Sequence, residues 1–210
     1  SRGLGDVYKR QTSDKAYENI EQVWGYKEND PMGGKDPYSA SKGAAELIIK
    51  SYFFSFFNKP QSNVRIGIGR AGNVIGGGDW AKDRIVVDCI CSWSDNKAVE
   101  VRNPSATRPW QHVLEPISGY LSLGQHLSCS DLLQGEAFNF GPKSDQNHTV
   151  KDLLVDLSKY WDFEDINQAF ILNEEKLFHE AGLLKLNCDK ANALLEWQPS
   201  LEYEDNIKFT

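Results

Sequence analysis

The chain has 210 residues, 40% of them hydrophobic and 25% charged, and a formal net charge of -7. This length suffices for one sizeable domain or for a large domain with a small lobe. The negative charge argues against a surface that coats nucleic acid, and no apolar run is long enough to cross a membrane. With no signal peptide and four cysteines that lack metal-site spacing, we expect reduced thiols and a cytoplasmic location.

The first quarter of the chain contains one strong helix signal after a long irregular stretch. Residues 1–11 show no clean period and are expected to form a loop or a non-native lead-in. Residues 16–37 carry two prolines and three glycines, which is typical of a loop. Asp36 is a suitable N-cap and Pro37 suits the first helical position, so the pattern predicts a helix from about residue 37 to residue 57.

Strand and helix patterns alternate through the rest of the chain. Strands are predicted at 63–70, 98–102 and 136–141. Helices are predicted at 82–95, at 112–128, at 149–161 and from about residue 189, and the last ten residues resemble the start of another helix. A glycine-rich loop spans 71–84. This alternation predicts an α/β protein with a largely parallel sheet.

The predicted helix at 37–57 is apolar nearly all round. One stripe at helical spacing consists of Tyr38, Lys42, Ala45, Ile49, Tyr52 and Phe56. Further large apolar side chains cover much of the remaining surface: Leu47, Ile48, Phe53, Phe54 and Phe57. Such a helix is expected to be buried on more than one side. One side can pack on the sheet, and the other needs another layer of the same chain or another subunit.

Tyr38 and Lys42 stand four residues apart, and are therefore neighbours on one face of this helix. A nearby ammonium group favours phenolate over phenol, so the tyrosine can act as a base nearer neutral pH. This Tyr-x-x-x-Lys arrangement occurs in nicotinamide-dependent dehydrogenases, but taken alone it fits an ordinary surface helix equally well.

Four segments narrow the interpretation: "TSDKAYEN" (12–19), "WGYKENDPMGGKDPYSASKGAAEL" (24–47), "RAGNVIGGGDWAKDR" (70–84) and "RPWQHVLEPISGYL" (108–121). In this order they resemble the extended short-chain dehydrogenase/reductase family, and within it the sugar-nucleotide 4,6-dehydratases that act on CDP-glucose. The resemblance implies an α/β fold: the C-terminal part of a Rossmann-like doubly wound parallel sheet plus a smaller substrate-binding α/β lobe. It assigns 12–75 and parts of 105–145 to the Rossmann-like core, and 76–104 and 146–210 to the lobe.

Two features depart from the family pattern. The glycine-rich dinucleotide fingerprint expected near the start is absent, and the glycines at 76–78 follow a later strand without the right spacing. The residues before Thr12 are polar and basic, where the family has an apolar strand. We therefore expect an N-terminally truncated chain in which residues 1 to about 11 are not native, and a last helix that is cut near its start.

The resemblance also implies a reaction, the conversion of CDP-glucose to CDP-4-keto-6-deoxyglucose with bound NAD, as in deoxysugar biosynthesis for lipopolysaccharide O-antigen. Tyr38 would take the proton of the C4 hydroxyl, with Lys42 supporting the tyrosine and holding the cofactor ribose. Ser13 would hydrogen-bond the C4 oxygen. Asp14 would be the acid and Lys15 the base of the following loss of water. Taken alone, Asp14 and Lys15 also fit an ordinary exposed ion pair.

Further residues are implied to bind the ligands. Asn73 would contact the sugar or the nicotinamide, although it also suits a turn. Arg84 and Arg108 would bind the substrate diphosphate, since a planar guanidinium matches phosphate oxygens. His112 either lies in the substrate pocket or caps the next helix, whereas Trp110 is expected in the core. The two apolar faces of the helix at 37–57 further predict a homodimer of the full-length protein through this helix.

Two alternatives stay open. The protein could be another sugar-nucleotide dehydratase or an epimerase of the same family, because a lysine after the aspartate also occurs in dehydratases that act on UDP-N-acetylglucosamine. It could instead be a non-catalytic fragment that keeps substrate-side residues and a dimerising helix but cannot hold NAD. The missing glycine fingerprint motivates this second alternative.

Overall fold

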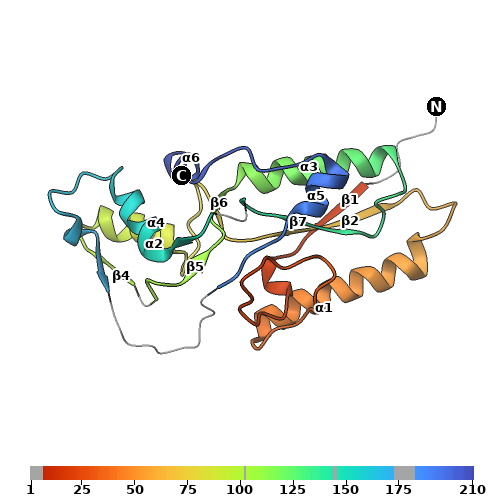
Figure 1. Cartoon of the computed structure of the whole chain (residues 1–210), viewed down its shortest axis with the longest axis horizontal. Coiled ribbons are helices and arrows are strands. Elements are labelled where there is room, and N and C mark those ends of the chain that lie inside the picture. Colours follow the sequence, from red (N-terminus) through yellow and green to blue (C-terminus); the bar gives the residue numbers. More distant parts are fainter. Residues whose placement is uncertain (1–6, 102, 144–145, 173–182) are drawn as a thin grey trace.

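The computed structural model describes residues 7–101, 103–143, 146–172 and 183–210. Its central feature is a parallel sheet with the strand order β1-β2-β7. The strands are β1 (Val7–Gln11), β2 (Arg65–Ala71) and β7 (Ala137–Phe140). Parallel neighbours need crossover connections, and helices supply them here, so the predicted α/β class is confirmed (Figure 1).

Helices cover both faces of this sheet. Figure 1 shows α3 (Leu114–Cys129) on one face and α1 (Pro37–Tyr52) on the other. In β2, glycines alternate with larger residues, and this alternation allows α3 to pack close to the strand. A Cβ built on Gly67 would lie 2.8 Å from Leu127 Cδ1, and one on Gly69 would lie 2.6 Å from Tyr120 Cε1. The glycines of β2 therefore face α3, and its larger side chains face α1.

The helix α1 begins as predicted. Asp36 is its N-cap, because its carboxylate accepts a hydrogen bond of 3.0 Å from the backbone N–H of Ser39, and Pro37 is the first helical residue. The helix continues into η2 (Phe53–Phe57), one turn of π-helix. Only one of its sides is covered by the described part of the chain. Several large apolar side chains are more than half exposed: Leu47, Ile48, Tyr52, Phe54 and Phe56.

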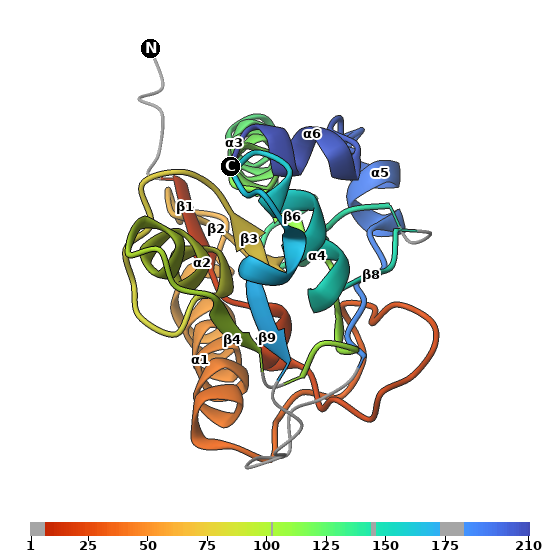
Figure 2. The same cartoon turned by 90° about the vertical axis from the view of Figure 1, so that its left-hand side faces the viewer.

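The chain also forms a smaller lobe, which lies beside the sheet at the left of Figure 1 and faces the viewer in Figure 2. Its helices are α2 (Ile85–Ser94), α4 (Val150–Ser158) and α6 (Tyr203–Lys208). Its paired short strands are β3 (Val74–Ile75) with β6 (Gln111–His112), β4 (Val99–Val101) with β9 (Phe170–Leu172), and β5 (Thr107–Arg108) with β8 (His148–Thr149). The 3-10 turn η3 (Ile166–Gln168) precedes β9. One apolar cluster that includes Trp93, Trp110 and Leu153 forms the core of this lobe.

Two expectations from the sequence are corrected. Residues 7–11 are not a loop: β1 pairs with β2 from Val7 opposite Arg65 to Gln11 opposite Gly69. The strand forms through backbone hydrogen bonds to β2, which do not require an apolar period in its side chains. Residues 1–6 of the expected lead-in lie outside the described residues.

The second correction concerns α5 (Asp189–Leu195), which was expected in the lobe with the rest of 146–210. It packs instead against the sheet layer. The cluster that it joins comprises Leu123, Leu127, Phe138, Phe140, Ala191, Leu195 and Trp197. The apolar side of a short helix packs wherever a matching surface is exposed, and here α3 and β7 offer it. Within the described ranges, no helix is long and apolar enough to span a bilayer.

Candidate active site

The candidate catalytic residues gather where β1 and β2 end. Ser13 and the 3-10 turn η1 (Asp14–Ala16) follow β1, and Asn73 follows β2. Because the two strands are parallel, the residues that follow them meet at one edge of the sheet, where α/β proteins bind their ligands. A Cβ built on Gly72 would lie 3.2 Å from Asp14 Oδ2, so Gly72 leaves room for this carboxyl group.

Asp14 has the most unusual environment of these residues, because it is only 3% exposed. Ser13 Oγ donates a hydrogen bond of 2.9 Å to Asp14 Oδ1 and accepts one of 3.2 Å from the Lys15 backbone N–H. Asp14 Oδ2 is buried without a hydrogen-bond partner among the described residues. Burial raises the pKa of Asp14, although Lys15 and the Ser13 hydroxyl act against this shift. The carboxyl group therefore keeps its proton to a higher pH than an ordinary aspartic acid does.

Tyr38 and Lys42 lie on the first two turns of α1, next to η1. Lys42 Nζ is 5.1 Å from the centre of the Tyr38 ring, so the helical spacing brings the two groups together as predicted. The tyrosine is 54% exposed and therefore open to a ligand. Gly43 allows α1 to lie close to the loop before it, since a Cβ built on Gly43 would lie 3.2 Å from the Gly33 backbone nitrogen.

A cavity of about 640 Å³ separates η1 from the start of α1. Its wall includes Asp14 and Lys15 on one side, and Asp36 and Ser39 on the other. Asp14 and Lys15 therefore line this cavity, whereas Ser13, Tyr38 and Lys42 are not among the residues of its wall.

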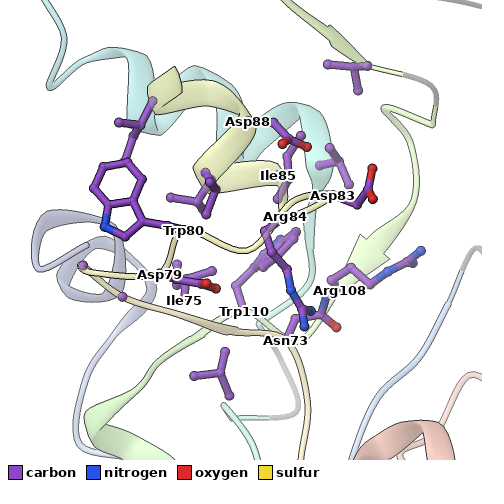
Figure 3. A pocket seen from close by; sticks show the side chains of 18 of the residues that line it. Asn73, Ile75, Asp79, Trp80, Asp83, Arg84, Ile85, Asp88, Arg108 and Trp110 are labelled. Carbon is purple, nitrogen blue, oxygen red and sulfur yellow. The ribbon is translucent and has the colours of Figure 1, made fainter. Parts of the chain in front are cut away.

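A second cavity, of about 370 Å³, lies on the lobe side of the same sheet edge. Figure 3 shows Asn73, Arg84 and Arg108 around it, so the structure brings the three predicted binding residues together. Arg108 lies close enough to Asp14 to act on its carboxyl group electrostatically. Trp110 lines this cavity but is 5% exposed and belongs to the lobe core, as predicted.

The geometry at His112 favours the capping alternative. Its Nδ1 accepts a hydrogen bond of 3.4 Å from the backbone N–H of Leu114, at the start of α3, and the ring is 7% exposed. The ring centre lies 6.1 Å from that of Phe209, in an edge-on contact. His112 is thus held between α3 and the end of α6, and it is not in the wall of either cavity.

The sequence interpretation missed a buried polar network behind η1. Glu46 of α1 and Arg70 of β2 form an ion pair in which both side chains are 1% exposed. Tyr17 and Asn139 extend this network to β7. A signal for it was present, since Arg70 lies among the apolar and glycine residues of β2, and Glu46 lies one helical turn after Lys42. The local sequence around Glu46 and Arg70 does not indicate that these two side chains form an ion pair.

A relative of known function is similar over most of the chain. The chain is 48% identical over 192 residues to the CDP-glucose 4,6-dehydratase of Salmonella typhimurium (strain LT2). The match covers 90% of this chain and 52% of that protein, so the chain spans about half the length of its curated relative. No protein-family model matches the chain. The resemblance that the four sequence segments indicated is thereby confirmed.

Solved structures share the fold at low sequence identity. A dTDP-glucose 4,6-dehydratase from Bacillus anthracis, in complex with NAD, superposes with a TM-score of 0.77 at 16% identity, over 95% of this chain and 58% of that one. A UDP-glucuronic acid 4-epimerase from Bacillus cereus, in complex with UDP-glucuronic acid and NAD, gives 0.80 at 18% identity, over 97% and 60%. The predicted Rossmann-like doubly wound sheet with a smaller α/β lobe is confirmed.

Proposed function

We propose, from the 48% identity to a CDP-glucose 4,6-dehydratase, that the protein carrying this chain is an NAD-dependent sugar-nucleotide 4,6-dehydratase that converts CDP-glucose to CDP-4-keto-6-deoxyglucose. The observation that carries the proposal is Asp14, a buried carboxyl group with a raised pKa and one unpartnered oxygen beside Lys15. A carboxyl group kept protonated near a lysine suits the removal of water from a sugar.

Tyr38 acts first in this proposal. In its phenolate form Tyr38 takes the proton of the C4 hydroxyl and becomes the phenol. Lys42, whose Nζ lies 5.1 Å from the centre of the Tyr38 ring, stabilises the phenolate before this step. The hydroxyl of Ser13 orients the C4 oxygen. When bound, NAD would supply the acceptor for the hydride of C4 and the donor that reduces C6. The residues that would hold it here are Tyr38, Lys42 and Asn73.

Elimination then uses the two residues of η1. The C4 ketone acidifies the C5 proton, and Lys15 takes that proton as a base. Asp14 gives its own proton to the departing C6 hydroxyl, which leaves as water, so the C5–C6 double bond forms with balanced charge. The unpartnered Oδ2 and the raised pKa of Asp14 support this role, because both favour a carboxyl group that donates rather than accepts.

The second cavity would hold the nucleotide part of the substrate. Arg84 and Arg108 supply guanidinium groups for the diphosphate, and Asn73 supplies an amide for the sugar next to them. The placement of Arg108 near Asp14 supports a substrate that runs from this cavity toward η1. His112 would contribute indirectly, by fixing the start of α3.

We further propose a cytoplasmic homodimer that associates through α1 and η2. The described part of the chain leaves much of this helix uncovered, and its exposed large apolar side chains beyond Tyr38 are Leu47, Ile48, Tyr52, Phe54 and Phe56. A large exposed apolar surface is typical of a contact site for another protein chain. A second copy of the chain is the partner that the two-sided apolar pattern predicts.

The test is to supply purified protein carrying this chain with NAD and CDP-glucose, and to follow the 4-keto-6-deoxy product by its absorbance in alkali. Parallel reactions with dTDP-glucose and UDP-N-acetylglucosamine separate the CDP-sugar enzyme from other dehydratases. A product epimerised at C4, with C6 still hydroxylated, would favour the epimerase alternative. We expect the 210-residue chain alone to form no product, because its sequence lacks a glycine-rich dinucleotide fingerprint.

A further inference from the structure

We propose that Thr12, Glu46, Arg70 and Tyr17 form a clamp that positions Ser13, Asp14 and Lys15 for the chemistry without touching the substrate. The clamp rests on the proposed function for its catalytic consequence, whereas its geometry stands by itself. The four residues are hereafter called the η1 clamp.

An ion pair is the centre of the η1 clamp. Arg70 Nε donates hydrogen bonds of 2.9 Å and 3.0 Å to the two carboxylate oxygens of Glu46, and Arg70 Nη2 donates one of 2.5 Å to Oε2. Both side chains are 1% exposed. A buried pair of this kind with near-ideal geometry fixes α1 to β2 in one register, because sliding or rotating the helix would leave two charges unpaired.

The residue before the catalytic segment is attached to this pair. Thr12 Oγ1 donates a hydrogen bond of 2.5 Å to Glu46 Oε1, and the Thr12 backbone N–H donates one of 2.9 Å to the Gly69 carbonyl oxygen. Thr12 is therefore fixed to α1 by its side chain and to β2 by its backbone. The position of Ser13, the next residue, follows from these two contacts.

The residue after the segment is attached to the other half of the pair. Arg70 Nη1 donates a hydrogen bond of 2.7 Å to the Tyr17 hydroxyl, which in turn donates one of 2.7 Å to Asn139 Oδ1 of β7. Tyr17 is 1% exposed. The three catalytic candidates and Ala16 thus lie between two residues that one ion pair holds in place.

The Glu46–Arg70 ion pair also fixes the position of α1, the helix that carries Tyr38 and Lys42. Glu46 follows Lys42 by four residues and so lies on the same side of α1 as Tyr38 and Lys42. One carboxylate therefore sets the distance between the helix that carries the first base and the turn that carries the acid. Misplacing reacting groups by about 1 Å can cost about 100-fold in rate, so this register matters for turnover beyond its effect on stability.

The test uses variants that disturb the clamp without unpairing its charges. Thr12→Val removes the hydroxyl at nearly constant volume and leaves Arg70 on Glu46, whereas Thr12→Ser restores a hydroxyl. Ser118→Ala is the control for stability alone, because Ser118 Oγ accepts a hydrogen bond of 2.8 Å from Trp197 Nε1 on the far side of the sheet. All variants are made in the full-length protein that carries this chain, with NAD present.

We expect Thr12→Val to lower kcat by about 10- to 100-fold with less than a threefold change in KM. Thr12→Ser should recover most of that loss, and Ser118→Ala should lower the melting temperature without changing kcat. An unchanged kcat in Thr12→Val would overturn the clamp. So would a loss of kcat that tracks the melting temperature in all three variants.

A second readout does not depend on turnover. The pKa of Asp14 can be followed by the ¹³C signal of its carboxyl group, assigned by its disappearance in Asp14→Asn. If the clamp holds η1 in its buried position, Thr12→Val should move this pKa down toward the ordinary value, because a loosened turn admits water. An identical titration in wild type and Thr12→Val overturns the clamp. Absence of turnover in the wild type, with the titration shifted as expected, contradicts only the proposed dehydratase function.

Discussion

Ser13 Oγ donates a hydrogen bond of 2.9 Å to Asp14 Oδ1, while Asp14 Oδ2 stays buried without a partner among the described residues. One carboxyl oxygen is thus held by the Ser13 hydroxyl, and the other is buried with its hydrogen-bonding capacity unused among the described residues. This asymmetry distinguishes Asp14 from a surface ion pair, which the sequence taken alone left possible.

Replacing Asp14 with asparagine should stop the reaction at elimination. The amide keeps the shape of the side chain but has no acidic proton for the departing hydroxyl, so kcat should fall by about 10²- to 10⁴-fold. Reduced cofactor should then accumulate and be visible in the near-ultraviolet spectrum. Asp165→Asn, at an exposed turn far along the chain, is the matched control. Elimination at the normal rate in Asp14→Asn would rule out the acid role.

The raised pKa of Asp14 also predicts how stability depends on pH. Below the ordinary aspartate value of 3.8, the carboxyl group is protonated in both the folded and the unfolded state. As the pH rises from that value to the folded-state pKa, the unfolded chain loses this proton first, and the folded state loses relative stability. Asp14→Asn removes this penalty, so its melting temperature should rise relative to wild type across that window. Parallel curves for the two proteins between pH 3 and neutral pH would contradict the burial of a titrating Asp14.

Tyr38→Phe should abolish the first oxidation rather than a later step. Tyr38 is 54% exposed, so the loss of its hydroxyl group should leave the stability of the fold unchanged. Tyr52→Phe is a close control, since Tyr52 lies on the same helix and is 55% exposed. Single-turnover measurements of cofactor reduction should show no reduction in Tyr38→Phe and normal reduction in Tyr52→Phe. Equal rates in the two variants would remove Tyr38 from the mechanism.

Arg84→Gln should weaken nucleotide binding more than catalysis. A guanidinium on a diphosphate contributes about 1.5–3 kcal/mol, which corresponds to about a 10- to 100-fold rise in the Kd for CDP. Titration calorimetry with CDP measures this directly and needs no turnover. Lys97→Gln, which removes one exposed positive charge elsewhere in the lobe, should bind CDP as the wild type does. A similar loss in both variants would indicate only a general effect of net charge.

Ile48→Asp should prevent self-association through α1. Ile48 is 57% exposed in the single chain, so the aspartate costs little folding stability but opposes burial against a second copy. Leu121→Asp is the control, because Leu121 is 71% exposed on α3, which lies on the opposite face of the sheet from α1. Sedimentation should give a dimer for the wild type and Leu121→Asp, and a monomer for Ile48→Asp. A monomeric wild type would end the dimer proposal.

Much of the fold could be read from short-range patterns. The N-cap Asp36 and Pro37 located the start of α1 to the residue, because capping involves groups only three positions apart. The spacing of Tyr38 and Lys42 was equally decisive, since a helix places such residues together whatever it packs on. The alternation in β2 predicted its strand, and the four segments predicted the Rossmann-like architecture. Local patterns therefore predicted most of the helices and the central strands, and the resemblance to the dehydratase family named most of the candidate residues.

The tertiary structure alone decided which of those residues meet and how far each is buried. Asn73 and Arg108 stand 35 positions apart, and only the packing of the lobe on the sheet edge brings them to one cavity. Glu46 and Arg70 look like ordinary surface charges in the sequence, yet they pair at 1% exposure because α1 lies on the face of the sheet opposite α3. Burial and pairing depend on what surrounds a side chain in space, and local sequence carries little of that information. For the same reason Asp14 could be named from the sequence, but its raised pKa and its free oxygen could not.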